Sequence, residues 1–209
     1  MNVSHRGYFL LALLTLVPAC ATYRAVELAN EVADLRKHPP RETVRMNDFE
    51  KEPWKRGSSS NALNQDLVEY VRPPETVNDW TELLTLKVEW RTSKPYTYAG
   101  GQTFSEVPDP SVVMEATKRS AEARCGGAVV FRKLDEDRTG TYPSVIFYLA
   151  SDKYPTASGS LAAEADVYRV FRGKHGLHTL IRARRAASLD EATLDEWTRY
   201  MKGFYLTDR

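Results

Sequence analysis

The chain has few of the residues from which catalytic and metal sites are usually built. It contains 2 cysteines and 4 histidines among 209 residues, too few for a disulfide framework. Phosphate-binding and dinucleotide-binding glycine motifs are missing, and "ASGSLA" around Ser158 and Ser160 does not match the G-x-S-x-G pattern of serine hydrolases. We therefore expect no enzyme and no cofactor, with an enzyme of unrecognised site as the weaker alternative.

Two short motifs have some features of metal sites but lack the required spacing. His175 and His178 stand three residues apart, which suits two ligands on a helix, yet Gly176 between them predicts a turn with surface histidines. "DEDRTG", residues 135–140, begins like a calcium loop, but Ile146 occupies the position that needs a glutamate. We expect an acidic hairpin loop there and no metal.

Long hydrophobic runs and a strong charge of either sign are also missing. The formal net charge is +1, so composition does not predict a polyanionic partner, and nucleic acid is not expected. The longest apolar run, Tyr8 to Val17, would extend about 15 Å as a helix, half of a bilayer core of about 30 Å. With Arg6 before it, this run is typical of a signal peptide over residues 1–19. A buried core helix is the alternative, which Pro18 disfavours.

The end of this apolar run contains one of the two cysteines. Val17-Pro18-Ala19-Cys20 resembles the lipobox of bacterial lipoproteins. The resemblance implies cleavage before Cys20 and attachment of fatty acyl chains to it, so that the lipid bilayer becomes a partner. Because two acyl chains give stable attachment where one does not, the chain would be a membrane protein without a spanning segment. Simple secretion is the alternative, because Ala19-Cys20-Ala21 also fits a signal peptidase site.

The residue after Cys20 bears on which membrane would hold the protein. Ala21 stands there instead of the aspartate that often marks inner-membrane retention. The resemblance therefore implies the outer membrane, facing the periplasm, with the inner membrane or secretion less favoured.

The segment after Cys20 divides into an expected helix and an expected tether. Residues 22–37 have apolar positions at helical spacing, and Pro39-Pro40 ends that pattern. Residues 41–64 are polar without a consistent period, so we interpret 20–64 as a lipidated N-terminus, a short helix and a tether. Phe49 and Trp54 are expected to dock on the following domain.

Residues 65–209 have the pattern of one α+β globular domain. "LLTLKVEWR" alternates, with Leu84, Leu86, Val88 and Trp90 predicted on the buried face of a strand. Asp109-Pro110 predicts a helix start, and Gly126 predicts its end near Arg124 and Cys125. Further strands are expected at 66–71, 128–134, 143–151, 163–172 and 177–186, and Ser188 to Glu191 has the form of a capping box before a C-terminal helix. Since strands and helices do not alternate, we expect a twisted antiparallel sheet of about six strands with helices packed on it.

Two segments of this domain show a further resemblance. "VRPPETVNDWTELLTL" and "VYRVFRGKHGLHTLIRARR" are similar to segments of small uncharacterised envelope proteins of Gram-negative bacteria. The expected element order is also similar to that of the PsbP-like α/β/α sandwich. The resemblance implies an exported bacterial protein and adds no catalytic motif.

The hairpin predicted over 167–186 is strongly basic. Its candidate anion-binding residues are Arg169, Arg172, Lys174, Arg182 and Arg184. Strand alternation predicts Arg182 and Arg184 on one face and Arg185 on the other. The candidate partners are a lipid headgroup, an anionic glycan or an acidic envelope protein, and the alternative is a solvated sheet face with edge protection.

Taken together, these patterns favour a membrane-anchored cell-envelope lipoprotein that acts as a binding or scaffold module. The alternative is a periplasmic domain that binds a small ligand in a cleft between sheet and helix.

Overall fold

The computed structural model describes most of the chain beyond residue 41. The described ranges are 42–47, 49–62, 64–91, 96–97, 103–104, 106–126, 129–155 and 161–208, with Asn30, Glu31, Ala33, Asp34 and Lys37 before them. The chain forms two units, Met1–Pro39 and Pro40–Arg209. The five described residues of the first unit are helical, as expected for residues 22–37. The predicted signal peptide and Cys20 lie outside the described residues.

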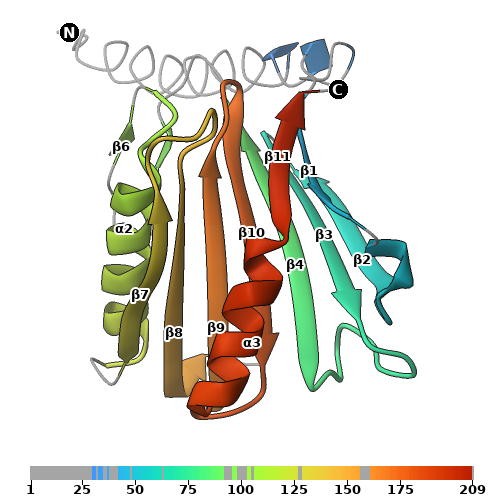
Figure 1. Ribbon diagram of the computed structural model, residues 1–209, viewed down its shortest axis with the longest axis vertical. Coiled ribbons are helices and arrows are strands. Elements are labelled where there is room, and N and C mark those ends of the chain that lie inside the picture. The colour runs from blue at the N-terminus through green and yellow to red at the C-terminus, as the bar shows by residue number, and fades with distance from the viewer. Residues whose placement is uncertain are drawn as a thin grey trace, which may run out of the picture. The chain divides into compact units, whose positions relative to one another are not determined.

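The second unit is built on one antiparallel sheet of seven strands (Figure 1). In spatial order these are β2 (Lys55–Ala62), β3 (Gln65–Val71), β4 (Glu82–Trp90), β10 (Gly176–Arg184), β9 (Leu161–Arg172), β8 (Ser144–Pro155) and β7 (Val130–Asp137). The predicted α+β class and the antiparallel sheet are confirmed, although strands dominate and number seven in this sheet instead of about six. The hairpin between β9 and β10 turns at residues 173–175, as its two glycines predicted.

Two helices pack on the sheet, and both begin at an aspartate. In α2 (Pro110–Arg124), the Asp109 side chain accepts a hydrogen bond from the Ser111 backbone N–H at 2.9 Å, as predicted. In α3 (Glu191–Lys202), the N-cap is Asp190, which accepts from the Thr193 N–H at 2.8 Å. The capping box expected from Ser188 is therefore wrong, because Thr193 also donates its hydroxyl to Asp190 and fixes the cap there.

Residues 42–62 do not form the tether that their polar composition suggested. β1 (Glu42–Met46) pairs with β11 (Phe204–Asp208), η1 (Phe49–Lys51) follows, and β2 joins the main sheet. Phe49 and Trp54 pack against the core below α3, as expected. A short pair, β5 (Tyr96–Thr97) with β6 (Thr103–Phe104), completes the described elements.

The core has two layers, one on each face of the sheet. On the face seen in Figure 1, α3 with β1 and β11 buries Trp197 and Met201 against Leu180 and Val167. On the opposite face, α2 covers a cluster that includes Phe147. Residues 145–150 in β8 are all buried because successive side chains point alternately into the two core layers. This explains their unbroken apolar run.

Candidate functional site

A groove lies between α2 and the half of the sheet formed by β3, β4 and β10. α2 packs mainly against β8 and β9, and within the described ranges no helix covers the next strands on this face. The groove has a volume of about 370 Å³, within the range of pockets that hold small molecules. It is lined by Gln65, Lys87, Glu89, Val113, Ala116, Thr117, Ser120, Arg124, Tyr168, Val170, Thr179 and Ile181.

The helical wall of the groove consists of short side chains. Val113, Ala116, Thr117 and Ser120 follow the spacing that places residues on one face of a helix. Because alanine, threonine and serine extend little beyond Cβ, the helix leaves room above the strands. Arg124 closes the C-terminal end of this wall, where its guanidinium donates to the Tyr154 hydroxyl at 3.0 Å.

The sheet wall comes from alternate residues of β4 and β10. Thr179 stands directly opposite Lys87 in the antiparallel register, and the ammonium of Lys87 lies 3.1 Å from a carboxylate oxygen of Glu89. The alternation in β4 predicted these side chains on the face away from Trp90, which the register confirms. The groove makes that face half-buried, since α2 stands over its border.

Asp166 and Tyr168 form a buried cluster beside the groove, which Tyr168 helps to line. The Tyr168 hydroxyl donates to Oδ2 of Asp166 at 3.2 Å, and its ring stacks on Phe147 with centroids 4.7 Å apart. Asp166 is 1% exposed. Its second oxygen, Oδ1, has no hydrogen-bond partner among the described residues. A buried carboxyl with a free oxygen is unusual, because burial of an unpaired polar atom costs free energy.

Burial dominates the protonation of this cluster. It raises the pKa of the Asp166 carboxyl well above the ordinary value, the nearby Glu164 carboxylate raises it further, and the Tyr168 hydroxyl opposes them. Burial also raises the pKa of the Tyr168 hydroxyl. Asp166 therefore keeps its proton to a higher pH than a surface aspartate does. Burial thus favours the neutral form of both groups behind the groove wall.

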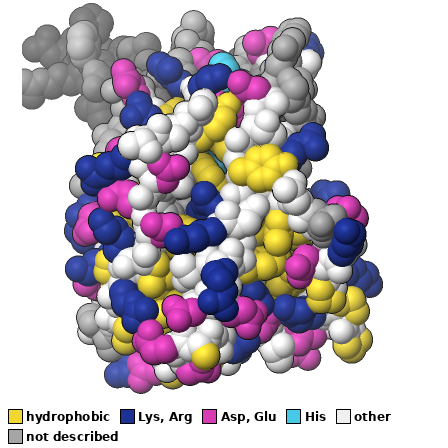
Figure 2. Space-filling model, viewed as in Figure 1, with side chains coloured by type: hydrophobic (Ala, Val, Ile, Leu, Met, Phe, Trp, Pro, Cys, Tyr) yellow, Lys and Arg dark blue, Asp and Glu magenta, His cyan; other side chains and the backbone are white. Residues whose placement is uncertain are grey.

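The basic residues predicted from the β9–β10 hairpin are distributed over three places. Arg182 and Arg184 lie on one face of the sheet, as predicted; it is the face that α3 covers, and the two share one carboxylate, Glu82. Arg182 is 3% exposed and stacks on Trp197 and Tyr200, 4.3 and 4.7 Å from the ring centroids. The outer surface on this side shows acidic and basic side chains interspersed (Figure 2). These two arginines thus neutralise an internal carboxylate below α3.

Arg169 supports the C-terminal end of α3. Its guanidinium donates to the backbone carbonyl of Met201, in the last turn of α3, at 2.7 Å and to that of Phe204, the first residue of β11, at 2.6 Å. Burial lowers the pKa of Arg169 to about 10, while Asp135 and Asp137 oppose that shift. Arg169 therefore has a structural role at the end of α3, which the other basic residues of the hairpin do not share.

Arg172 and Lys174 come together at the turn edge, defined here as the end of the sheet that carries the β9–β10 turn. With Arg91 they line a second pocket of about 340 Å³. The Lys174 ammonium lies 2.8 Å from a carboxylate oxygen of Asp208. Of the five candidate anion-binding residues, the structure thus leaves these two at a concave surface.

The two histidines of the hairpin differ in their surroundings. His175 is exposed, but His178 is buried, so the expectation of a surface histidine is wrong for His178. Alternation in β10 turns its ring to the α3 face, where Nε2 lies 3.5 Å from the Glu42 carboxylate and Trp90 packs edge-on. In the part of the chain that the structure describes, no group of three or more His, Cys, Asp or Glu side chains is placed to hold a metal ion.

The sequence analysis offered a cleft between sheet and helix as an alternative, but it named none of the residues that line the groove and missed the buried acid. The one available signal was Asp166, an acid inside "AADVYRVF", where its neighbours predict a buried strand. Cys125 is buried and free at the end of α2, as expected of a small residue there. The acidic loop predicted over 135–140 is correct only for residues 138–140, because Asp135 to Asp137 belong to β7, and Asp137 accepts from the backbone N–H groups of Thr139 and Gly140.

Comparison with known proteins adds no assignment. No protein-family model matches the chain, and no curated protein shows significant sequence similarity to it. Among the described residues, each helix is too short or too polar to cross a bilayer.

Proposed function

We propose that the protein is a lipid-anchored binding module of the cell envelope, held to the membrane through acylated Cys20. Its domain would face the periplasm from the outer membrane and take a small ligand in the groove beside α2. The observation that carries the binding role is the groove itself, about 370 Å³ between a helix with short side chains and an uncovered half-sheet. The Gram-negative envelope resemblance and the lipobox support the location.

The lining of the groove favours a small ligand with both apolar and polar groups. Val113 and Ile181 offer apolar contact, while Thr117 and Thr179 offer hydroxyls. The Lys87–Glu89 ion pair sits in the floor. A ligand group that pairs with Lys87 would have to compete with Glu89, and one that pairs with Glu89 would have to compete with Lys87.

A role as a scaffold for other proteins has less support. Stable protein interfaces usually centre on a contiguous apolar patch. The large apolar side chains exposed among the described residues are Val112, Val130, Leu161 and Tyr205, and they stand on four different elements.

The placement of one helix on each face of the sheet supports the proposed likeness to a PsbP-like α/β/α sandwich.

The binding role is tested by thermal unfolding of the chain against a panel of small envelope metabolites. A ligand at 100 times its dissociation constant adds about 2.7 kcal/mol of stability, a shift that is readily measured. The variant Thr117→Trp fills the groove from the helical wall and should abolish the shift. Val112→Trp, on the exposed side of the same helix, is the matched control and should preserve it.

Two outcomes would reject this function. One is a panel hit whose shift survives Thr117→Trp, because the ligand would then bind elsewhere. The other is the absence of any stabilising ligand together with stable capture of a partner protein that Val112→Trp disrupts.

A further inference from the structure

The turn edge of the domain joins the entry of the chain to a basic pocket. Glu42, the first residue of β1, accepts hydrogen bonds from the backbone N–H groups of Lys174 and His175, the latter at 3.1 Å. The carbonyl of His175 in turn accepts from the Arg91 N–H at 2.7 Å. The chain therefore enters the domain at the same turn that carries the second pocket.

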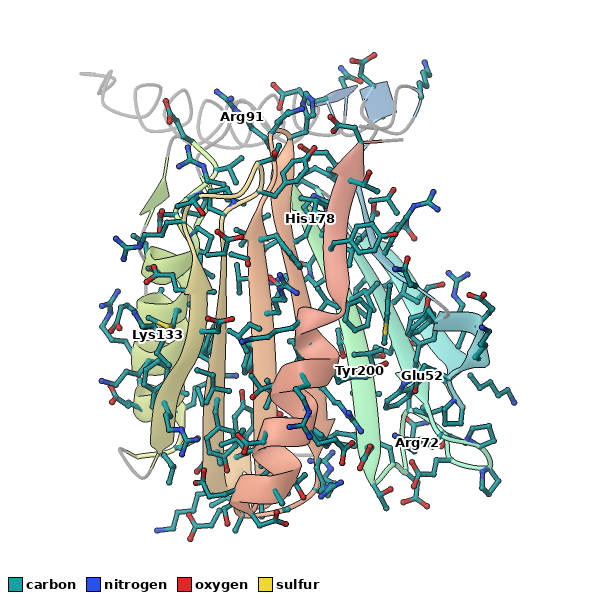
Figure 3. The ribbon with its side chains drawn as sticks, viewed as in Figure 1. Glu52, Arg72, Arg91, Lys133, His178 and Tyr200 are labelled. Atoms are coloured by element: carbon teal, nitrogen blue, oxygen red, sulfur yellow. The ribbon has the colours of Figure 1, made fainter. Side chains whose placement is uncertain are left out.

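Three cations and one acid surround this pocket. Arg91, Arg172 and Lys174 line it together with Glu106, and its volume is about 340 Å³. Figure 3 shows Arg91 at the turn edge, far from Arg72 near the other end of the sheet. Val107 and Pro143 complete an apolar part of the lining.

Two of the three cations are not engaged in salt bridges with described residues, although Glu106 lines the same pocket. Within the described part of the chain, Arg91 and Arg172 make no salt bridge, whereas Lys174 is paired with Asp208. Arg182 and Arg184 differ in this respect, because both form salt bridges with Glu82. Two unpaired guanidinium groups at a concave surface match the oxygens of a phosphate group, which arginine binds in bidentate geometry.

The proposed anchor places this edge near a lipid surface. Residues 20–41 connect the acylated cysteine to Glu42, and a chain of that length spans at most about 75 Å when fully extended. The short tether holds the pocket at a high local concentration of headgroups. Basic residues near an anionic membrane surface strengthen binding to it.

We propose that Arg91 and Arg172, with Lys174, form a binding site for the phosphate of an anionic phospholipid headgroup, so that the turn edge of the domain docks on the membrane that carries it. This proposal rests on the lipid-anchored location proposed above, but not on the ligand groove. The site would orient the domain, with the pocket against the bilayer.

The test uses the chain from residue 20 onward with Cys20→Ser, so that no acyl chain attaches. It is sedimented with vesicles of phosphatidylcholine alone and of phosphatidylcholine with phosphatidylglycerol. We expect binding only to the anionic vesicles, and weaker binding at high salt because the Debye length shortens. The double variant Arg91→Glu with Arg172→Glu should reduce the affinity at least about tenfold.

The matched control reverses two exposed arginines away from the turn edge, Arg56→Glu with Arg199→Glu. It makes the same change in net charge and should leave most of the vesicle binding intact, and circular dichroism checks that both variants fold. Equal loss in the two double variants would overturn the proposal in favour of a diffuse charge effect. So would vesicle binding that survives Arg91→Glu with Arg172→Glu.

A third arm separates a headgroup from a soluble anion. Inorganic pyrophosphate is titrated against the same chain without vesicles. Stabilisation by pyrophosphate with no binding to anionic vesicles would overturn the headgroup assignment. Thr117→Trp should leave vesicle binding unchanged, so that failure of the headgroup site and failure of the ligand groove are distinguished.

Discussion

At the scale of single residues, Glu82 is the carboxylate that compensates the arginines below α3. Its two oxygens face the guanidinium groups of Arg72, Arg182 and Arg184. Burial raises the pKa of Glu82, but the hydrogen bonds and charges of these arginines outweigh burial, so the pKa lies below its ordinary value. The carboxylate thus stays charged and compensates the buried Arg182.

We expect Glu82→Gln to lower the free energy of unfolding by about 3 kcal/mol, because it leaves the buried Arg182 guanidinium without its counter-charge. Urea denaturation measures the loss. The control is Glu191→Gln, which breaks an ion pair with Arg132 in which the glutamate side chain is 75% exposed, and its midpoint should stay unchanged. Equal effects of the two variants would contradict the internal role of Glu82.

Glu42 makes a pH-dependent contribution to stability. Burial raises the pKa of its carboxyl, but the contact with His178 and the N–H groups of Lys174 and His175 outweigh burial, so the pKa lies below the ordinary 4.5. A carboxyl with a lowered folded-state pKa stabilises the protein above its unfolded-state pKa. That stability is lost as the pH falls through the folded-state pKa.

The difference in unfolding free energy between the parent and Glu42→Gln should therefore be largest at neutral pH and should shrink below about pH 4. Urea denaturation from pH 7 to pH 3 measures it. His178 is retained in both proteins. A difference that grows in acid would reject this account.

At the scale of elements, the β9–β10 turn depends on Gly173. A Cβ at this position would collide with the Glu42 carboxylate and would lie 2.8 Å from the carbonyl oxygen of Gly176. The turn and β1 approach each other so closely that only glycine fits.

Gly173→Ala should loosen β1 and β11 while leaving the main sheet folded. Hydrogen exchange should become faster at residues 42–46 and 204–208, with protection in β8 unchanged. His175→Ala is the matched control in the same turn, because it keeps the backbone N–H that donates to Glu42. Faster exchange throughout the sheet would show that the two strands are not a separate unit.

The predictability of each element follows from where its stabilising contacts lie. β4 and α2 could be predicted because alternation, the Asp109 cap and the Gly126 stop are local signals. β1 could not, because its partner β11 is formed by the last residues of the chain. β2, "KRGSSSNA", is a polar strand at the edge of the sheet, where one side needs no partner.

The candidate site was predictable only in part, because its contacts also join residues far apart in the sequence. The faces of Arg182 and Arg184 followed from alternation, but their neutralisation by Glu82 joins residues about a hundred positions apart. The groove depends on which strands α2 leaves uncovered. That is a tertiary property, which no local pattern of the helix encodes.

At the scale of the whole molecule, the anchor decides where the binding groove operates. We expect Cys20→Ala to move the protein from the membrane fraction to the soluble periplasmic fraction, because no acyl chain can then be attached. Cell fractionation with immunoblotting measures the distribution. A protein that stays in the membrane fraction without Cys20, or that is soluble with it, would refute the lipid anchor.

Because β1 pairs with β11, β1 cannot pair until β11 has been synthesised. The first described strand in the sequence, β1, finds its partner in residues 204–208, which are synthesised after every strand of the main sheet. At about 5–20 residues per second, synthesis of the intervening chain takes about 10 to 30 s. During that interval β1 has both edges open, so it is the segment that a nascent-chain chaperone would need to shield.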